Sequence, residues 1–338
     1  MTSPPAAVAL AKPAEGFTAR EARQAGRLTL VVGIVSGFFV LELAGALVAD
    51  SIALQADALH LLTDVLALGT SLLAMHLAVR RPTPRLTFGL RRAEPVAAIV
   101  TAFLLLGSTG LIVVEAVESL RGGTPPKTGI MLLVASMALL VNGLSAWLLK
   151  DVIGHGHSDG SHDLHDSRGQ EGHSEHNHDA AQHRAAGRHA GHGHALNLRG
   201  AWLHLAGDTL GALAAIVAAL VIQAGGSTSA DPVASLVVAA ILVFGALRLA
   251  RDAALVLLEA APPHLPVAVV RDFILAFPGV LSIHDLHVWT LGAGHDAITA
   301  HVSTGSEDPT LGRRLSDRIR TELGPEYVTV QVEVIRST

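Results

Sequence analysis

The pattern His-x-x-x-Asp occurs twice in this sequence, as His60 with Asp64 and as His204 with Asp208. Each copy lies inside an apolar stretch that is long enough to cross a membrane. In a helix, a spacing of four residues puts both side chains on one face, about 6 Å apart along the axis. Two such helices facing each other would offer two imidazoles and two carboxylates, a ligand set suited to tetrahedral Zn²⁺. The two motifs therefore predict one shared metal site inside the membrane.

A simpler explanation exists for one motif alone, because His and Asp can hydrogen-bond neighbouring helices. The second copy favours the metal site, since ionisable residues are rare within the bilayer and usually mark a functional site. The roles of three other polar residues in the apolar stretches stay open. One interpretation is that all three line the metal path: Glu42, Asp57 and Asn142. The alternative for Glu42 and Asn142 is a hydrogen bond between helices.

The composition is typical of a membrane protein. Hydrophobic residues make up 50% of the 338 residues and charged residues only 16%, an excess of apolar surface that a bilayer takes up. A net charge of -5 gives no electrostatic case for a nucleic-acid partner, a role that normally needs a clustered basic surface. The chain has no cysteine, which excludes disulfides and thiolate ligands. Any metal must be bound by His, Asp or Glu.

Six apolar segments have nearly the ~20 residues that a spanning helix requires. They cover residues 28–48, 52–79, 95–117, 129–149, 201–224 and 232–249. Arginines before the first segment and between the second and third predict that both termini lie in the cytoplasm. The Ala-rich and Gly-rich composition favours a bacterial inner membrane. The predicted domains are a cytoplasmic tail at 1–27, a transmembrane domain at 28–255 and a cytoplasmic domain at 256–338.

The loop between the fourth and fifth segments, residues 151–197, is rich in Gly, Ser, Asp and above all His. It has no apolar period, which predicts a disordered cytoplasmic segment. Because ordering a flexible loop costs entropy, its metal sites should be weak and exchangeable. We expect capture and buffering of metal; the alternative is a solvated linker. The predicted weak ligands are His155, His157, His162, His165, His173, His176, His178, His192 and His194.

After Arg251 the pattern changes to that of a small soluble α+β domain. Helical and strand-like periods alternate in the order αββαβ. The predicted elements are a helix at 266–277, strands at 280–291 and 297–303, a helix at 309–323 and a strand at 327–335. The predicted fold is therefore an α-helical membrane protein with six transmembrane helices followed by a small cytoplasmic α+β domain.

Several further motifs resemble, in order and at the expected intervals, the signatures of the cation diffusion facilitator family. They are Ser51-Ile-Ala-Leu-Gln-Ala-Asp-Ala-Leu-His60, Thr87-Phe-Gly-Leu-Arg-Arg-Ala-Glu94, Asn197-Leu-Arg-Gly-Ala-Trp-Leu-His204, Asp231-Pro-Val-Ala-Ser235 and His284-Asp-Leu-His-Val-Trp289. This resemblance covers most of the chain. It implies a homodimeric six-helix transporter that exports divalent metal from the cytoplasm against protons, with a metallochaperone-like αββαβ cytoplasmic domain.

Position by position, the resemblance implies that His60, Asp64, His204 and Asp208 form the transport site. Two His-Asp pairs are similar to the set in zinc-preferring members. One departure is Leu90, where many relatives have Tyr. That position lies outside the ligand set and bears only on the cytoplasmic loop.

The resemblance also implies a metal site in the cytoplasmic domain. His284 on the first strand, His301 on the second and Glu333 on the last match positions of the family's cytoplasmic zinc site. His287 is expected on the same face as His284. Where relatives often have another His, this chain has Glu326, which argues against a full binuclear site. The alternative is a group of surface histidines on a half-exposed sheet.

The expected function is proton-coupled efflux of a divalent metal by alternating access, with zinc first and cobalt or cadmium next. Zinc is then the cargo and also a regulatory ion, and no prosthetic group is expected. Two other functions are weighed: a membrane sensor or buffer that binds metal without transport, and a zinc-dependent hydrolase. A hydrolase needs an open coordination position and a general base. Neither motif has a nearby Glu, so we do not expect an enzyme.

Overall fold

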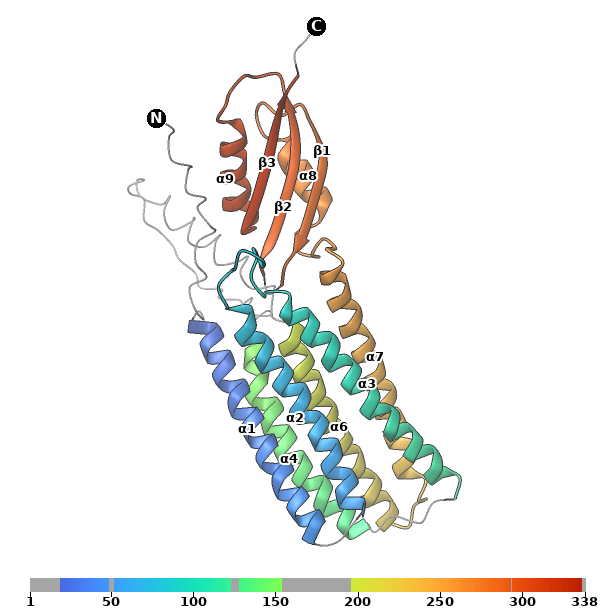
Figure 1. Ribbon diagram of the computed structural model, residues 1–338. Coiled ribbons are helices and arrows are strands. Elements are labelled where there is room, and N and C mark those ends of the chain that lie inside the picture. The colour runs from blue at the N-terminus through green and yellow to red at the C-terminus, as the bar shows by residue number, and fades with distance from the viewer. Residues whose placement is uncertain (1–18, 49–51, 123–127, 154–195, 293, 336–338) are drawn as a thin grey trace, which may run out of the picture. The chain divides into compact units, whose positions relative to one another are not determined.

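A computed structural model describes residues 19–48, 52–122, 128–153, 196–292 and 294–335 (Figure 1). The side chains of some positions within the helices, among them Asp57 and His60, lie outside this description. The chain divides into a unit of six long helices and a smaller α+β unit.

Six long helices make up the first unit, and each contains a segment long and apolar enough to cross a membrane. They are α1 (Ala19–Val48), α2 (Ile52–Ala78), α3 (Ala93–Leu120), α4 (Thr128–Ile153), α6 (Leu196–Gln223) and α7 (Ala230–Leu257). The six predicted spans are thus confirmed in the described part of the chain. Several helices exceed the apolar segments, α1 by its first turns and α7 by its last. Helical hydrogen bonding continues beyond the hydrocarbon layer, so hydropathy alone underestimates helix length.

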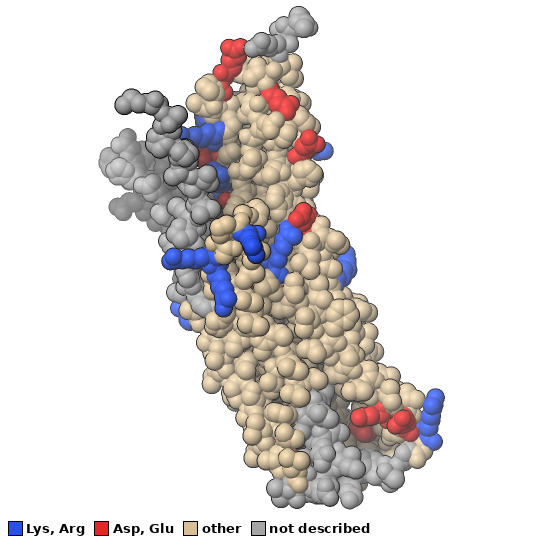
Figure 2. All heavy atoms as spheres, in the orientation of Figure 1, with Lys and Arg blue, Asp and Glu red and all other residues tan. Residues whose placement is uncertain are grey.

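Figure 2 shows one flank of the helical unit, where charged side chains gather at two ends and uncharged residues lie between them. The loop between α2 and α3 carries the exposed residues Arg80, Arg81 and Arg85, whereas the other end of α3 carries exposed acidic residues. Between the ends, large side chains such as Phe103 and Phe244 are 67% and 70% exposed. A surface of this kind requires lipid to cover it.

Four of the helices form a closed ring of neighbours. The helix α1 packs along α2, and α2 meets α6 at a buried polar contact described below. Between α6 and α4, a Cβ added to Gly143 would lie 3.9 Å from the methyl group of Thr209. Between α4 and α1, Arg27 donates a hydrogen bond to the carbonyl of Leu148. The ring α1, α2, α6 and α4 therefore encloses an interior into which all four helices can direct side chains.

The helices α3 and α7 pack against each other and against α6. Their buried cluster consists of Leu105, Val238, Leu242 and Ala246, joined by Leu203 of α6. A Cβ added to Gly207 would lie 2.3 Å from a methyl carbon of Leu242, so the absence of a side chain there permits the close approach of α7. Tight packing fixes the rotation of α6, on which one of the two motifs lies.

The second unit contains two helices and three strands in the predicted order αββαβ. They are α8 (Val267–Leu275), β1 (Ser282–Thr290), β2 (Asp296–Thr304), α9 (Leu311–Leu323) and β3 (Tyr327–Val334). The strand β2 lies in the centre, antiparallel to β1 and parallel to β3. Alternate residues of β2, Ile298, Ala300 and Val302, pack against both helices in one core. Both helices of the described part of this unit thus lie on one face of the sheet, and the intervening residues of β2, such as His301, face the other side.

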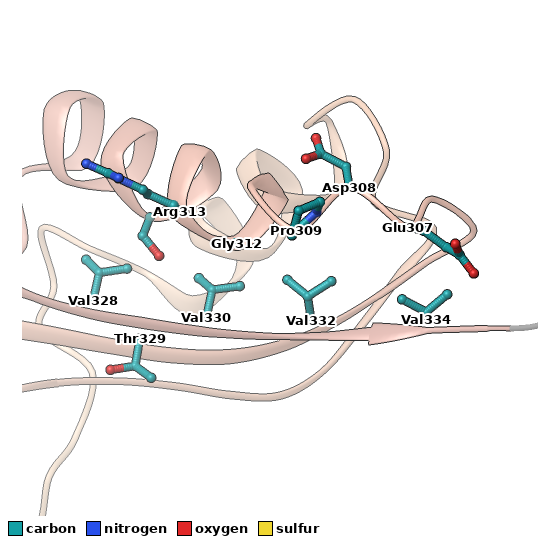
Figure 3. Close-up of a pocket in the computed structure, with 11 residues that line it drawn as sticks. Glu307, Asp308, Pro309, Gly312, Arg313, Val328, Thr329, Val330, Val332 and Val334 are labelled. Atoms are coloured by element: carbon teal, nitrogen blue, oxygen red, sulfur yellow. The ribbon is translucent and has the colours of Figure 1, made fainter. Parts of the chain in front are cut away.

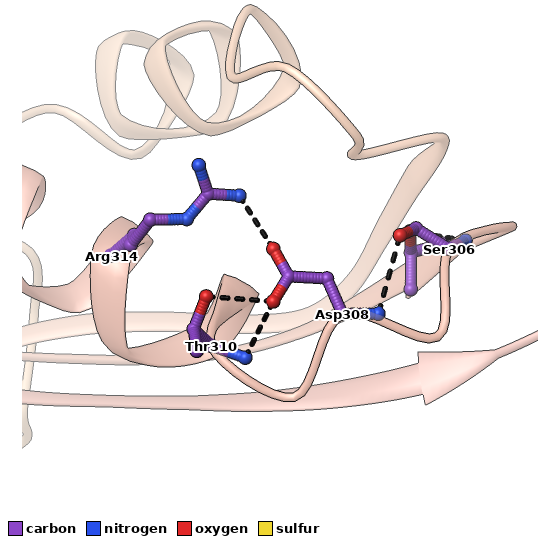
Figure 4. Close-up of polar contacts among 5 residues, drawn as sticks. Ser306, Asp308, Thr310 and Arg314 are labelled. Atoms are coloured by element: carbon purple, nitrogen blue, oxygen red, sulfur yellow. Dashed lines mark hydrogen bonds and ion pairs between the residues drawn. The ribbon is translucent and has the colours of Figure 1, made fainter.

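The start of α9 is fixed by a carboxylate. Asp308 accepts hydrogen bonds from the hydroxyl and the backbone N–H of Thr310 at 2.6 and 2.8 Å (Figure 4). Arg314 donates to its other oxygen at 2.8 Å. The hydrogen bond from the Thr310 hydroxyl, then that from its backbone, holds the pKa of Asp308 below its usual value. A negative charge here also favours the positive end of the helix dipole.

A groove of about 600 Å³ runs between α9 and β3 (Figure 3). Val330 and Val332 of β3 line one side, and Arg313 of α9 lines the other. A Cβ added to Gly312 would lie 3.0 Å from Val332, which shows how closely the helix approaches the strand. The groove lies on the face of the sheet that the helices cover.

His264, in the turn before α8, anchors the beginning of β2. Its Nε2 donates to a carboxylate oxygen of Asp296 at 2.6 Å, and the Asp296 side chain is 9% exposed. This hydrogen bond raises the pKa of His264, against the opposing effect of burial. Beside it, His295 pairs with Glu326, whose backbone N–H donates to the carbonyl of Asp296. The two pairs join the turn before α8, the beginning of β2 and the beginning of β3.

We predict that the α+β unit is more stable at pH 6 than at pH 9, and that His264→Gln removes most of this difference. The hydrogen bond to Asp296 raises the pKa of His264 in the folded state above its ordinary value of 6.5. The stabilisation is therefore complete below pH 6.5 and is lost as the pH rises through the raised pKa. The variant should lose about 1.5 kcal/mol at pH 6.

Hydrogen-exchange protection of residues 262–335 in the full-length protein measures this effect, after correction for intrinsic exchange rates. The matched control is His287→Gln, because His287 is exposed on β1. An unchanged pH dependence in His264→Gln would show that the pair does not stabilise the fold.

Candidate metal centres

The two membrane motifs meet at one buried contact between α2 and α6. His204 is 0% exposed, and its Nε2 lies 2.6 Å from Oδ1 of Asp64, which is 1% exposed. The same nitrogen lies 3.9 Å from Oδ2 of Asp208, one turn further along α6. Residues 140 positions apart in the sequence are thus direct neighbours in the bundle.

These three side chains have the geometry of a metal-binding group. One ligand atom from each of Asp64, His204 and Asp208 lies within 4.8 Å of the other two. Oδ2 of Asp64 and Nδ1 of His204 are buried and have no hydrogen-bond partner in the described part of the chain. Two carboxylates in a low-dielectric interior are unfavourable without compensating positive charge. A divalent cation would supply that charge and would accept this set of N and O donors.

His60 precedes Asp64 by one turn of α2. Its side chain lies outside the described residues, so its role as the fourth ligand stays a prediction. The structure brings together three of the four predicted residues of this centre.

A second group lies on the sheet of the α+β unit. His284 on β1 is paired directly opposite His301 on β2, and their rings are 5.2 Å apart in an edge-to-face arrangement. Glu333 on β3 contacts both, with Oε1 3.2 Å from Nδ1 of His301 and Oε2 3.5 Å from Nε2 of His284. All three predicted residues of the cytoplasmic site therefore lie together, again with ligand atoms within 4.8 Å.

The two groups differ in access to water. The side chains of His284, His301 and Glu333 are 46%, 33% and 41% exposed, on the face of the sheet opposite the helices. An ion bound there would exchange with solution directly. An ion between α2 and α6 would reach its ligands only if the helices move.

A bulge in β1 sets the position of its second histidine. The pairing register shifts between His284 and His287, and Asp285 has a φ of +48°. Residues three apart in a regular strand face opposite sides of the sheet. The extra residue of the bulge returns His287 to the exposed face that His284 occupies. His287 lies opposite Thr299 and is not in the three-residue group.

Other histidines take different places. The predicted weak ligands of the loop, from His155 to His194, lie outside the described residues. Glu326, which replaces the expected extra histidine, pairs with His295. Neither this pair nor His264 with Asp296 was predicted, because no spacing or periodicity relates residues that are 31 and 32 positions apart.

Comparison with known sequences gives matches to both units. Residues 28–258 match the cation efflux transmembrane domain, and residues 262–335 match the cytoplasmic domain of cation efflux proteins. The first match includes both His-Asp motifs, and the second includes the group on the sheet. The boundary between the matches falls just after α7 ends.

Individual relatives align over nearly the whole chain. The zinc transporter ZitB of Escherichia coli is 35% identical over 316 residues, covering 93% of this chain and 88% of the relative. The cadmium, cobalt and zinc/H(+)-K(+) antiporter of Bacillus subtilis is 29% identical over 308 residues, covering 89% and 86%. A probable proton-coupled zinc antiporter of Bos taurus, SLC30A3, is 30% identical over 326 residues, covering 95% and 80%. With both domains matched in order, the chain belongs to the cation diffusion facilitator family of metal efflux transporters.

Proposed function

We propose that this protein exports Zn²⁺ from the cytoplasm in exchange for protons, with His60, Asp64, His204 and Asp208 as the transport centre. The observation that carries the proposal is the buried contact of one imidazole nitrogen with two carboxylates, at 2.6 and 3.9 Å. Ionisable residues within membrane-spanning helices are rare and usually mark a functional site. A centre that binds a cation reversibly needs such a combination.

Zinc fits the donor set best. With His60, the centre offers two nitrogen and two oxygen ligands, which suit the tetrahedral geometry of Zn²⁺. Co²⁺ and Cd²⁺ accept similar donors, so the ligands alone favour zinc only in part. The relatives named as zinc transporters add support for zinc as the main cargo.

Proton exchange follows from the atom that the metal must use. At 2.6 Å, the Nε2–H of His204 donates a hydrogen bond to Asp64. An ion held by Asp64, His204 and Asp208 together would bind on the side of the ring where Nε2 faces both carboxylates. It would need the lone pair of Nε2, so the proton must leave this nitrogen when the ion binds. When the ion leaves, the two buried carboxylates again favour a compensating proton. Metal and proton thus compete for one centre, which is the requirement for antiport.

The remaining parts of the chain have supporting roles in this proposal. The protein lies in a bacterial inner membrane, with both termini in the cytoplasm. The inward proton gradient across that membrane drives export by alternating access. Two copies associate as a homodimer through the cytoplasmic domain. The histidines of residues 154–195 capture metal near the entrance, and the group of His284, His301 and Glu333 binds zinc as a regulatory ion.

We predict that Asp208→Asn lowers zinc transport in proteoliposomes by roughly a hundredfold, because an amide is a poorer ligand and leaves the loaded centre one negative charge short. The matched control is Asp252→Asn on α7, whose carboxylate pairs with Arg199 near the surface. The control should transport at the wild-type rate. Full transport by Asp208→Asn would contradict the proposed centre, and zinc binding without flux in the wild type would favour a sensor.

We also predict that each zinc ion entering an inside-out vesicle is matched by release of one or two protons from the lumen. The competition for Nε2 of His204 requires this coupling. A pH-sensitive dye in the lumen and a zinc-sensitive dye measured together give the ratio. Zinc accumulation that neither moves protons nor slows when an ionophore collapses the gradient would indicate a facilitated channel.

For the cytoplasmic group, we predict that Glu333→Gln weakens zinc-induced protection of residues 262–335 from hydrogen exchange by about tenfold in zinc concentration. Glu333 is the only one of the three ligands that carries a negative charge, and it contacts both histidines. The matched control is Glu326→Gln, which alters the other exposed His-Glu pair. Equal effects of both variants would mean that the group on the sheet has no special affinity for zinc.

A further inference from the structure

Asn142 occupies the centre of the buried face of α4. It is 5% exposed, and Ala135 and Leu149, seven residues away on either side, are 7% and 0% exposed. On the opposite face, Leu140 and Trp147 are 73% and 56% exposed, as expected for side chains that contact lipid. Because α4 is a member of the four-helix ring, its buried face is directed to the interior of that ring.

The interior of the ring also contains the transport centre, at the same depth as Asn142. The helices α4 and α6 run in opposite directions (Figure 1). A Cβ added to Gly143, the residue after Asn142, would lie 3.9 Å from the methyl group of Thr209, the residue after Asp208. The hydroxyl of Thr209 donates a hydrogen bond to the carbonyl of Leu205 in α6, and the methyl group of Thr209 faces α4. Asn142 and Asp208 each come one residue before this point of close approach, on α4 and α6 respectively.

The oxygen of this amide is unsatisfied. Oδ1 of Asn142 is buried and has no hydrogen-bond partner in the described part of the chain. If Asn142 only joined helices, its oxygen would accept a hydrogen bond from a neighbour. A buried acceptor without a donor is unfavourable, and such atoms in native proteins call for an explanation. A cation in the ring interior would satisfy it, because amide oxygens are ligands for divalent ions.

We propose that Asn142 is a selectivity residue of the transport centre, whose amide oxygen is an additional ligand for cations larger than Zn²⁺. This inference rests on the proposed function. The four residues His60, Asp64, His204 and Asp208 complete the tetrahedral coordination that zinc prefers. Larger divalent ions such as Cd²⁺ take more ligands, so a fifth donor stabilises them more than zinc. Asn142 thus extends the range of metals that the transporter accepts.

The test compares Zn²⁺ and Cd²⁺ uptake by proteoliposomes that contain the full chain or its variants. Asn142→Leu should raise the KM for Cd²⁺ by about tenfold and the KM for Zn²⁺ by less than about threefold. Asn142→Asp keeps an oxygen in the same position and should retain Cd²⁺ transport. The matched control is Thr109→Val on α3, a helix that is not in the ring. Like Asn142→Leu, it removes a buried oxygen that has no hydrogen-bond partner in the described part of the chain. The control should change neither KM.

Thermal melting of the metal-free protein separates selectivity from structure. Since Oδ1 has no hydrogen-bond partner among the residues that the structure describes, Asn142→Leu should melt at the wild-type temperature or above it. A lower melting temperature together with an equal loss for both cations would show that Asn142 is structural, and unchanged KM values would also overturn the inference. If wild-type vesicles take up neither cation, the proposed function itself is wrong. If the wild type transports normally and Asn142→Leu has unchanged KM values, only the role of Asn142 is wrong.

Discussion

The contact between His204 and Asp64 is the constraint on which the membrane unit depends. Ionisable groups are tolerated in an apolar interior only where they meet a partner, so α2 and α6 must approach each other at this point and at a fixed rotation. The rest of the bundle serves that requirement. The missing side chain at Gly207 allows α7 to press closely on α6. On the other side, α4 meets α6 at Gly143 and α1 closes the ring. Small residues at these crossings let the helix backbones approach closely.

The transmembrane part could be predicted from the sequence because its signals are periodic. Hydropathy gives six spans, and a spacing of four puts His and Asp on one face of each motif. The occurrence of the motif on two helices implies that those helices meet. By contrast, the closed ring and the depth of Asn142 relative to Asp208 depend on which helices pack together, and no local pattern carries that information. The same is true of His264 and Asp296, whose pairing arises from the folding of a turn onto a strand.

The group on the sheet shows a second limit of pattern analysis. Strand periodicity places residues two apart on one face, yet His284 and His287 share a face at a spacing of three. The reason is a single backbone conformation at Asp285, which inserts a residue into β1. A bulge of this kind has no composition signal apart from the tolerance of Asp for positive φ. The cross-strand pair of His284 and His301 therefore depends on register, and a slip of one residue would move His284 into the core.

The parallel pairing of β2 with β3 has a consequence for biosynthesis. Because the two strands run in the same direction, the chain must pass through α9 before β3 can join the sheet. Glu333 lies near the end of β3, whereas α2 and α6 precede the whole α+β unit in the chain. During translation the membrane motifs can therefore insert and meet while the sheet still lacks Glu333. A ribosome-bound chain that ends before β3 would contain the centre in the bilayer but no complete group on the sheet.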